Sequence, residues 1–181
     1  MMLILGIVLA ISSWGFGYWR SRPVLDYYGP AAIALISKPD SVSALKLEPG
    51  NAFSDLKFGD QSFDIVAERP VTVARGYTNA RDALTKRQTY EWPQDESTSE
   101  TQSTSETQSS CEPEWTHALR FVQQKDIIVL LLSLECPRVA LVGREGTLTL
   151  RPKVAAEFAK ILSAELDGEA AEAEPPGEPA E

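Results

Sequence analysis

A long apolar stretch at the start of the chain is the first clear feature in its pattern of hydrophobic and polar positions. Residues 2–19 contain no charged side chain, and as a helix they would span roughly 27 Å, enough for a thin hydrocarbon core. Aromatic side chains gather at the end of the stretch, as they do at membrane interfaces: Trp14, Phe16, Tyr18 and Trp19. The pattern predicts a membrane anchor or signal-like segment over residues 1–22, in the form of an apolar helix.

Three interpretations of this stretch compete. A cleaved signal peptide begins with Lys or Arg and ends in small residues, whereas Ala-Ile-Ser at residues 10–12 makes a poor cleavage site. A retained single-pass anchor therefore fits better, and a buried core helix is the third interpretation. Arg20 and Arg22 follow the stretch, and the positive-inside rule would place the rest of the chain in the cytoplasm. The cysteines and a resemblance described below favour an extracytoplasmic domain instead, so the sequence leaves the topology open.

Short alternating segments after residue 40 predict a β-sheet. Leu45 and Leu47 share one face of a strand over residues 41–47. The continuous apolar run over residues 127–134 has the length and the β-branched start of a central strand covered on both faces. Other strands are predicted over residues 63–67, 118–123, 138–142 and 147–150. Four consecutive strands before a terminal helix indicate an antiparallel meander.

Helical patterns complete the predicted fold. Pro152 opens a helix whose apolar side chains form one stripe: Val154, Ala155, Phe158, Ile161, Leu162 and Leu166. Shorter helices are expected over residues 31–37, after Gly29 and Pro30, and from Thr78 or Asn79 to about residue 88, on the surface. The predicted fold class is α+β: an antiparallel sheet of about four to six strands with the C-terminal amphipathic helix packed on it, plus the N-terminal apolar helix.

One polar segment interrupts the predicted folded part of the chain, and a second follows it. Residues 97–108 are the hexapeptide STSETQ written twice, so a disordered insertion is predicted over residues 94–110. An acidic tail over residues 168–181 is also predicted to be disordered, which leaves one domain over residues 23–167. Residues 95–112 and 168–181 together contain ten acidic residues, and their removal changes the formal net charge from −9 to +1. The chain shows no basic patch of the kind that nucleic-acid binding needs.

The chemistry-bearing residues are few. Cys111 and Cys136 are the two cysteines, and a disulfide between them would contribute about 3 kcal/mol in an exported protein. Together with His117 and either Glu112 or Glu114 they could instead bind zinc, although the spacing matches no common zinc finger. Cys136 and His117 could also form a nucleophile pair. No catalytic, cofactor-binding or metal residue is predicted, and no small-molecule substrate is identified.

Residues 89–166 resemble small bacterial proteins of unassigned function, notably from planctomycetes, that carry an N-terminal export or anchor segment. The similar elements are Tyr90-Glu91-Trp92-Pro93, Cys111-Glu112-Pro113, His117-Ala118-Leu119-Arg120-Phe121, Leu134-Glu135-Cys136 and the terminal amphipathic helix. In that family the apolar strand ends in a Cys-Phe-x-Cys-like element. Ser133 stands here at the position of the first cysteine, which leaves Cys136 alone. The resemblance implies export and architecture, and no activity.

These patterns lead to one main functional expectation. The chain is expected to be a non-enzymatic, membrane-anchored or exported domain that serves as an interaction or structural module at the cell envelope. Its expected partners are the membrane, through the N-terminal segment, and an unidentified protein. The alternative is a thiol-dependent enzyme or redox protein that uses Cys136 with His117 nearby. A third hypothesis is a membrane subunit whose anchor packs with other helices through small residues: Gly6, Ala10, Gly15 and Gly17.

Overall fold

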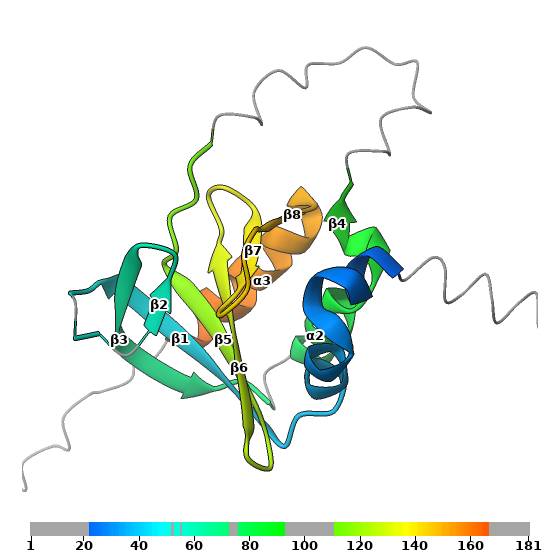
Figure 1. Ribbon diagram of the computed structural model, residues 1–181, viewed down its shortest axis with the longest axis horizontal. Coiled ribbons are helices and arrows are strands. Elements are labelled where there is room, and N and C mark those ends of the chain that lie inside the picture. The colour runs from blue at the N-terminus through cyan, green and yellow to red at the C-terminus, as the bar shows by residue number, and fades with distance from the viewer. Residues whose placement is uncertain (1–21, 52, 55, 73–75, 93–110, 167–181) are drawn as a thin grey trace, which may run out of the picture.

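An antiparallel β-sheet runs through the described part of the chain (Figure 1). The structure is a computed structural model, and it describes residues 22–51, 53, 54, 56–72, 76–92 and 111–166. The strands are β1 (Ser41–Pro49), β2 (Leu56–Phe58), β3 (Gln61–Pro70), β4 (Tyr90–Glu91), β5 (His117–Gln123), β6 (Asp126–Ser133), β7 (Arg138–Leu141) and β8 (Leu148–Leu150). Their order in the sheet is β2-β3-β1-β5-β6-β7-β8-β4, and every neighbouring pair is antiparallel.

The sheet has eight strands, more than the four to six that the sequence predicts. The predicted meander from β5 to β8 is confirmed. Alternation does not reveal β2 and β4, because they are three and two residues long. The predicted insertion over residues 94–110, the predicted tail over residues 168–181 and nearly all of the predicted anchor lie outside the described residues.

The central strand β6 is only partly covered. Leu130, Leu131 and Leu132 are fully buried, as predicted for a strand with both faces in the core, whereas Ile127 is 60% exposed. The β5–β6 turn extends away from the helices (Figure 1). In this turn Gln124 has a φ of +54°, and its N–H donates to the Asp40 carboxylate at 2.7 Å.

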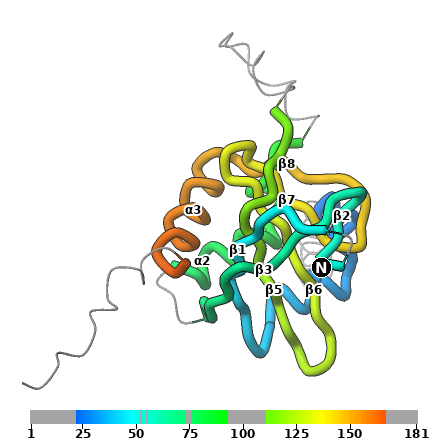
Figure 2. Tube along the Cα trace, turned by 90° about the vertical axis from the view of Figure 1, so that its left-hand side faces the viewer, coloured from blue at the N-terminus to red at the C-terminus, as the bar shows by residue number. Residues whose placement is uncertain are grey.

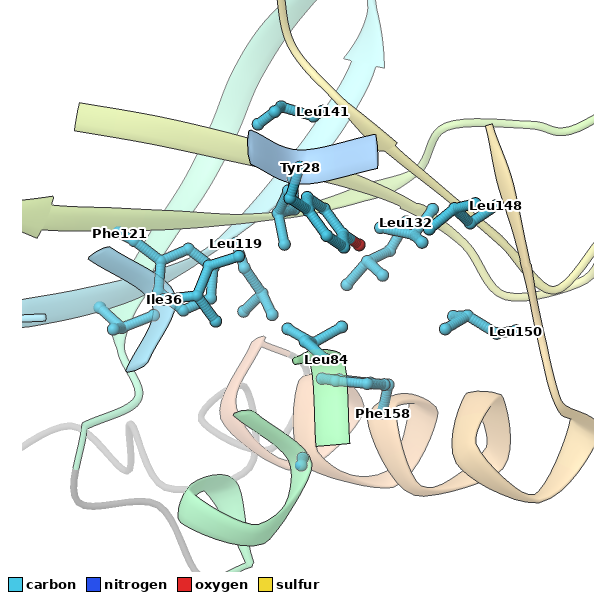
Figure 3. Packing of buried hydrophobic residues seen from close by; sticks show 14 of the residues in the cluster. Tyr28, Ile36, Leu84, Leu119, Phe121, Leu132, Leu141, Leu148, Leu150 and Phe158 are labelled. Carbon is cyan, nitrogen blue, oxygen red and sulfur yellow. The ribbon is translucent and has the colours of Figure 1, made fainter. Parts of the chain in front are cut away.

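Three helices cover one face of the sheet (Figures 1 and 3). They are the N-terminal helix over residues 22–37, α2 (Tyr77–Leu84) and α3 (Pro152–Leu166), and a short 3-10 helix, η1 (Arg87–Thr89), precedes β4. α3 forms where its apolar stripe predicts it. Helices and sheet together enclose the larger core, which includes Tyr28, Ile36, Leu84, Leu119, Phe121, Leu132, Leu141, Leu148, Leu150 and Phe158.

The N-terminal helix differs from both helices predicted in this region. The predicted apolar helix lies outside the described residues, and the helix over residues 22–37 is amphipathic, with Val24 buried and Arg22 and Asp26 exposed. It also begins before Gly29 rather than after Pro30. Gly29 has a φ of +78°, a left-handed conformation that glycine adopts readily, so the predicted start corresponds to a left-handed residue inside the helix. Among the described helices, none combines the length and the apolarity needed to span a bilayer.

Helix α2 packs one face against the larger core and exposes the other, so the predicted surface position holds for its outer face alone. It begins at Tyr77 rather than at Thr78 or Asn79, and Gly76 at its N-cap has a φ of +83° without a capping side chain. Tyr77 is 2% exposed and Leu84 is fully buried. The sequence prediction omits Tyr77 from the apolar face, and this omission makes the face seem too thin to pack.

The other face of the sheet is covered by strands of the same sheet, because the sheet bends over on itself. In the pairing of β1 with β3, Lys46 is opposite Ala67 and Leu47 is opposite Ile65, which leaves Val66 as an extra residue. Such a bulge bends a strand and increases its twist, and β1, β2 and β3 turn away from the plane of β5 and β6 (Figure 2). A smaller core forms there from Leu45, Leu47, Leu56, Phe63, Trp115, Ala118, Leu131 and Ala140.

Candidate functional site

The two cysteines lie together. The Cα atoms of Cys111 and Cys136 are 5.9 Å apart and their sulfurs are at bonding distance, as in a disulfide. Cys136 is 4% exposed and belongs to the turn between β6 and β7. Its Sγ also lies 3.1 Å from the carbonyl oxygen of Glu112. The pair therefore attaches the segment over residues 111–116, which we call the wall segment, to the β6–β7 turn.

The wall segment is also held at its other end. The backbone N–H of Leu47 donates to the carbonyl oxygen of Thr116 at 2.8 Å, which continues the pairing of β1 with β5. Between the two ends, Trp115 is 6% exposed and its ring meets that of Phe58 edge to face, with 5.6 Å between the centroids. The segment is thus fixed in position, and it contributes to two clefts.

The larger cleft, which we call the acidic cleft, lies between the β2–β3 hairpin and the wall segment. Its volume is about 600 Å³. Three buried apolar side chains line it, and its charged lining residues are all acidic. The lining residues are Leu47, Pro49, Gly50, Asp60, Gln61, Ser62, Phe63, Glu112, Pro113, Glu114, Trp115 and Thr116. Concave, mostly apolar surfaces with a few polar groups are typical of binding sites.

Gly50 fixes the side of the acidic cleft opposite the wall segment. Its N–H donates to the carbonyl oxygen of Ser62 at 2.7 Å, and a Cβ at this position would lie 2.1 Å from Ser54 Oγ. That hydroxyl is itself engaged, because it accepts from the N–H of Asn51 at 2.7 Å. Glycine is therefore the residue that fits here. The same loop presents Phe53 to solvent, with 96% of it exposed.

A second cleft of about 500 Å³, which we call the disulfide cleft, lies beside the cysteine pair. Its charged residues have both signs, since it contains Glu91, Glu135 and Arg138. Small residues of α3 form another part of it. The full lining is Glu91, Cys111, Leu134, Glu135, Cys136, Pro137, Arg138, Thr149, Pro152, Ala155, Ala156 and Ala159. Both clefts therefore depend on where the cysteine pair holds the chain.

The buried tyrosines lie in the larger core, away from either cleft lining. The Tyr90 hydroxyl donates to the carbonyl oxygen of Leu84 at 2.7 Å and lies 2.9 Å from the Tyr28 hydroxyl. Burial raises the pKa of both phenols above the ordinary tyrosine value. These hydroxyls are accordingly neutral hydrogen-bonding groups of the core.

The remaining sequence-predicted site residues are arranged as follows. His117 is half-buried at the start of β5, and its Nδ1 lies 2.9 Å from the Thr116 hydroxyl. Glu112 and Glu114 line the acidic cleft. The sulfurs of the two cysteines bond to each other rather than to a metal. Within the described ranges, no group of three His, Cys, Asp or Glu side chains could hold a metal ion. The geometry therefore does not assemble the hypothetical zinc site.

The sequence does not reveal the acidic cleft. Asp60, Gln61 and Ser62 belong to the β2–β3 hairpin, and the wall segment comes some fifty residues later, so no local motif joins them. The one available signal is the sequence Pro-Gly-Asn at residues 49–51, which is typical of a turn. Comparison with protein-family models, with curated proteins and with solved structures gave no match for this chain.

Proposed function

We propose that this chain is a non-enzymatic, disulfide-bridged module at the cell envelope, attached to the membrane by residues 2–19 and engaged with a protein partner. The observation that carries the proposal is the contact of Cys111 with Cys136 at bonding distance, in a chain with two cysteines. Structural disulfides persist in exported proteins and are rare in the reducing cytosol.

The location of the bridge supports a structural role. Cys136 is buried, and the bridge fixes the wall segment that shapes both clefts. With a sequence separation of 25, the chain-entropy model gives a stabilisation of about 3 kcal/mol. A sulfur that is part of a disulfide has no thiolate to offer. The arrangement thus favours a structural module over thiol chemistry by Cys136 with His117 nearby.

The apolar start of the chain supports membrane attachment. Residues 2–19 are uncharged, and aromatic residues gather at their carboxyl end, where an interface would lie. The resemblance to small exported bacterial proteins supports the same compartment. Arg20 and Arg22 are the opposing evidence, because they favour a cytoplasmic domain under the positive-inside rule. The state of the cysteines distinguishes the two compartments.

The test is the intact mass of the native full-length protein, alkylated under denaturing conditions with and without prior reduction. We expect no alkylation before reduction and alkylation of both cysteines after it. A Cys111→Ser variant is the control, because its remaining thiol must alkylate without reduction if the reagent reaches Cys136. Two thiols that alkylate without reduction in the native protein would overturn the proposal and favour a cytoplasmic, thiol-dependent protein. A mass that lacks the N-terminal segment would identify that segment as a cleaved signal peptide.

A further inference from the structure

We propose that the acidic cleft binds a basic segment of a partner protein in which lysine or arginine alternates with apolar residues. This inference rests on the proposed function, since it identifies the surface through which a partner-binding module would contact its partner. It is carried by three features of the described residues: the charge of the rim, the apolar lining and the rigid walls.

The rim of the acidic cleft is negative on both sides. Asp60 comes from the β2–β3 turn, whereas Glu112 and Glu114 come from the wall segment, and all three are exposed. The lining contains no Lys, Arg or His, and Lys57, which is opposite Ser62 in the hairpin, lies outside it. Carboxylates spread along a rim favour a ligand with several cationic groups over a single ion.

The interior of the acidic cleft is apolar. Leu47, Phe63 and Trp115 are 4, 5 and 6% exposed, so they offer an apolar surface without being free to rearrange. An apolar side chain of the ligand can pack against this surface. In an extended segment with alternating basic and apolar residues, the basic side chains would pair with the acidic rim and the apolar side chains would pack against the interior.

The walls of the acidic cleft are fixed before any ligand arrives. The Gly50 N–H bonds to Ser62 on one side, and the Leu47 N–H bonds to Thr116 on the other. The cysteine pair holds the start of the wall segment, with 5.9 Å between its Cα atoms. Pre-formed walls lower the entropy cost of binding, because these bonds already hold the described wall residues in place.

Charge indicates that the ligand comes from another molecule. Residues 93–110 and 167–181 of this chain contain acidic residues and no Lys, Arg or His, so they are repelled by the rim. Residues 1–21 contain Arg20 as their one charged side chain, which is one cationic group for three carboxylates. A separate protein with a cluster of basic residues matches the rim better than any of these segments.

The experiment uses the full-length protein in mild detergent and a fluorescently labelled short peptide of alternating lysine and leucine, with binding followed by fluorescence anisotropy. A peptide with glutamate in place of lysine is the charge-reversed control, and spermidine is a cationic competitor without apolar groups. We expect binding of the lysine peptide, no binding of the glutamate peptide and weak competition by spermidine. No binding of the lysine peptide, or equally effective competition by spermidine, would overturn the proposal.

A pair of matched double variants locates the site. Asp60→Asn with Glu114→Gln removes two rim charges, and we expect the lysine peptide to bind about tenfold more weakly. Glu145→Gln with Glu157→Gln removes the same charge at exposed positions outside the cleft lining, and we expect unchanged affinity. Equal losses in both variants would show non-specific attraction and overturn the proposal.

The cysteine state is measured on the same sample, so an intact bridge with no peptide binding would reject this inference and leave the proposed function standing.

Discussion

At the residue scale, two buried tyrosines of the same core differ in how their hydroxyls are satisfied. The Tyr90 hydroxyl has two neighbours, the Leu84 carbonyl oxygen at 2.7 Å and the Tyr28 hydroxyl at 2.9 Å. The Tyr77 hydroxyl is buried with no hydrogen-bond partner among the described residues. A buried polar group without a partner lowers stability, whereas one with good partners does not. The two residues therefore make a matched pair for mutation.

The Tyr90→Phe variant is expected to lower the free energy of unfolding by about 1–3 kcal/mol, because the Leu84 carbonyl and the Tyr28 hydroxyl lose a partner in the core. The Tyr77→Phe variant removes the same atom at a site without a partner in the described part of the chain, so its free energy of unfolding is expected to be unchanged or higher. Urea unfolding followed by circular dichroism measures both. Equal losses in the two variants would contradict the assigned hydrogen bonds.

The same tyrosines predict a loss of stability at alkaline pH. Burial raises the pKa of Tyr28, Tyr77 and Tyr90 in the folded protein above the ordinary tyrosine value of about 10. Above that pH the unfolded chain releases these protons and the folded protein keeps them. The free energy of unfolding must then fall with rising pH, by up to about 1.4 kcal/mol per pH unit and tyrosine. Urea unfolding between pH 8 and pH 11 measures the slope, which should become shallower in Tyr90→Phe. A flat profile would contradict the prediction.

At the element scale, the wall segment is the feature on which both clefts depend. Replacing both cysteines, Cys111→Ser with Cys136→Ser, is expected to lower the free energy of unfolding by about 3 kcal/mol, since the unfolded chain loses a constraint across a separation of 25 residues. Far-UV circular dichroism should be unchanged, because strands β5 and β6 keep their hairpin pairing. Reduction of the wild-type protein serves as an independent measurement of the same quantity. If neither treatment shifts the urea midpoint, the bridge is not part of the native protein.

The same scale shows which elements the sequence could predict. β6 and α3 have patterns long enough to define their period, so both are found with nearly correct bounds. β2 and β4 have three and two residues, and their existence depends on pairing with β3 and β8. Of the candidate site, the cysteine pair follows from composition. The acidic cleft is lined by the β2–β3 hairpin and the wall segment, which lie far apart in the sequence.

At the scale of the whole molecule, the helix over residues 22–37 is an integral part of the larger core. It contributes five buried residues to the larger core: Val24, Tyr28, Ala32, Leu35 and Ile36. Deleting buried side chains of this size costs about 2–5 kcal/mol each, and a domain has about 5–15 kcal/mol in total. The helix is therefore indispensable to the fold, although it directly follows the proposed membrane anchor.

Two truncations separate the anchor from the domain. A chain without residues 1–21 is expected to keep its free energy of unfolding within about 0.5 kcal/mol and to move from the membrane fraction to the soluble fraction. A chain without residues 1–37 is expected not to fold, because it lacks the five core residues of the N-terminal helix. Fractionation and circular dichroism of both chains measure these outcomes. If the chain without residues 1–21 unfolds, the result would contradict the proposal of a membrane anchor and assign residues 2–19 to the core as a buried helix. The compartment question would then rest on the cysteines alone.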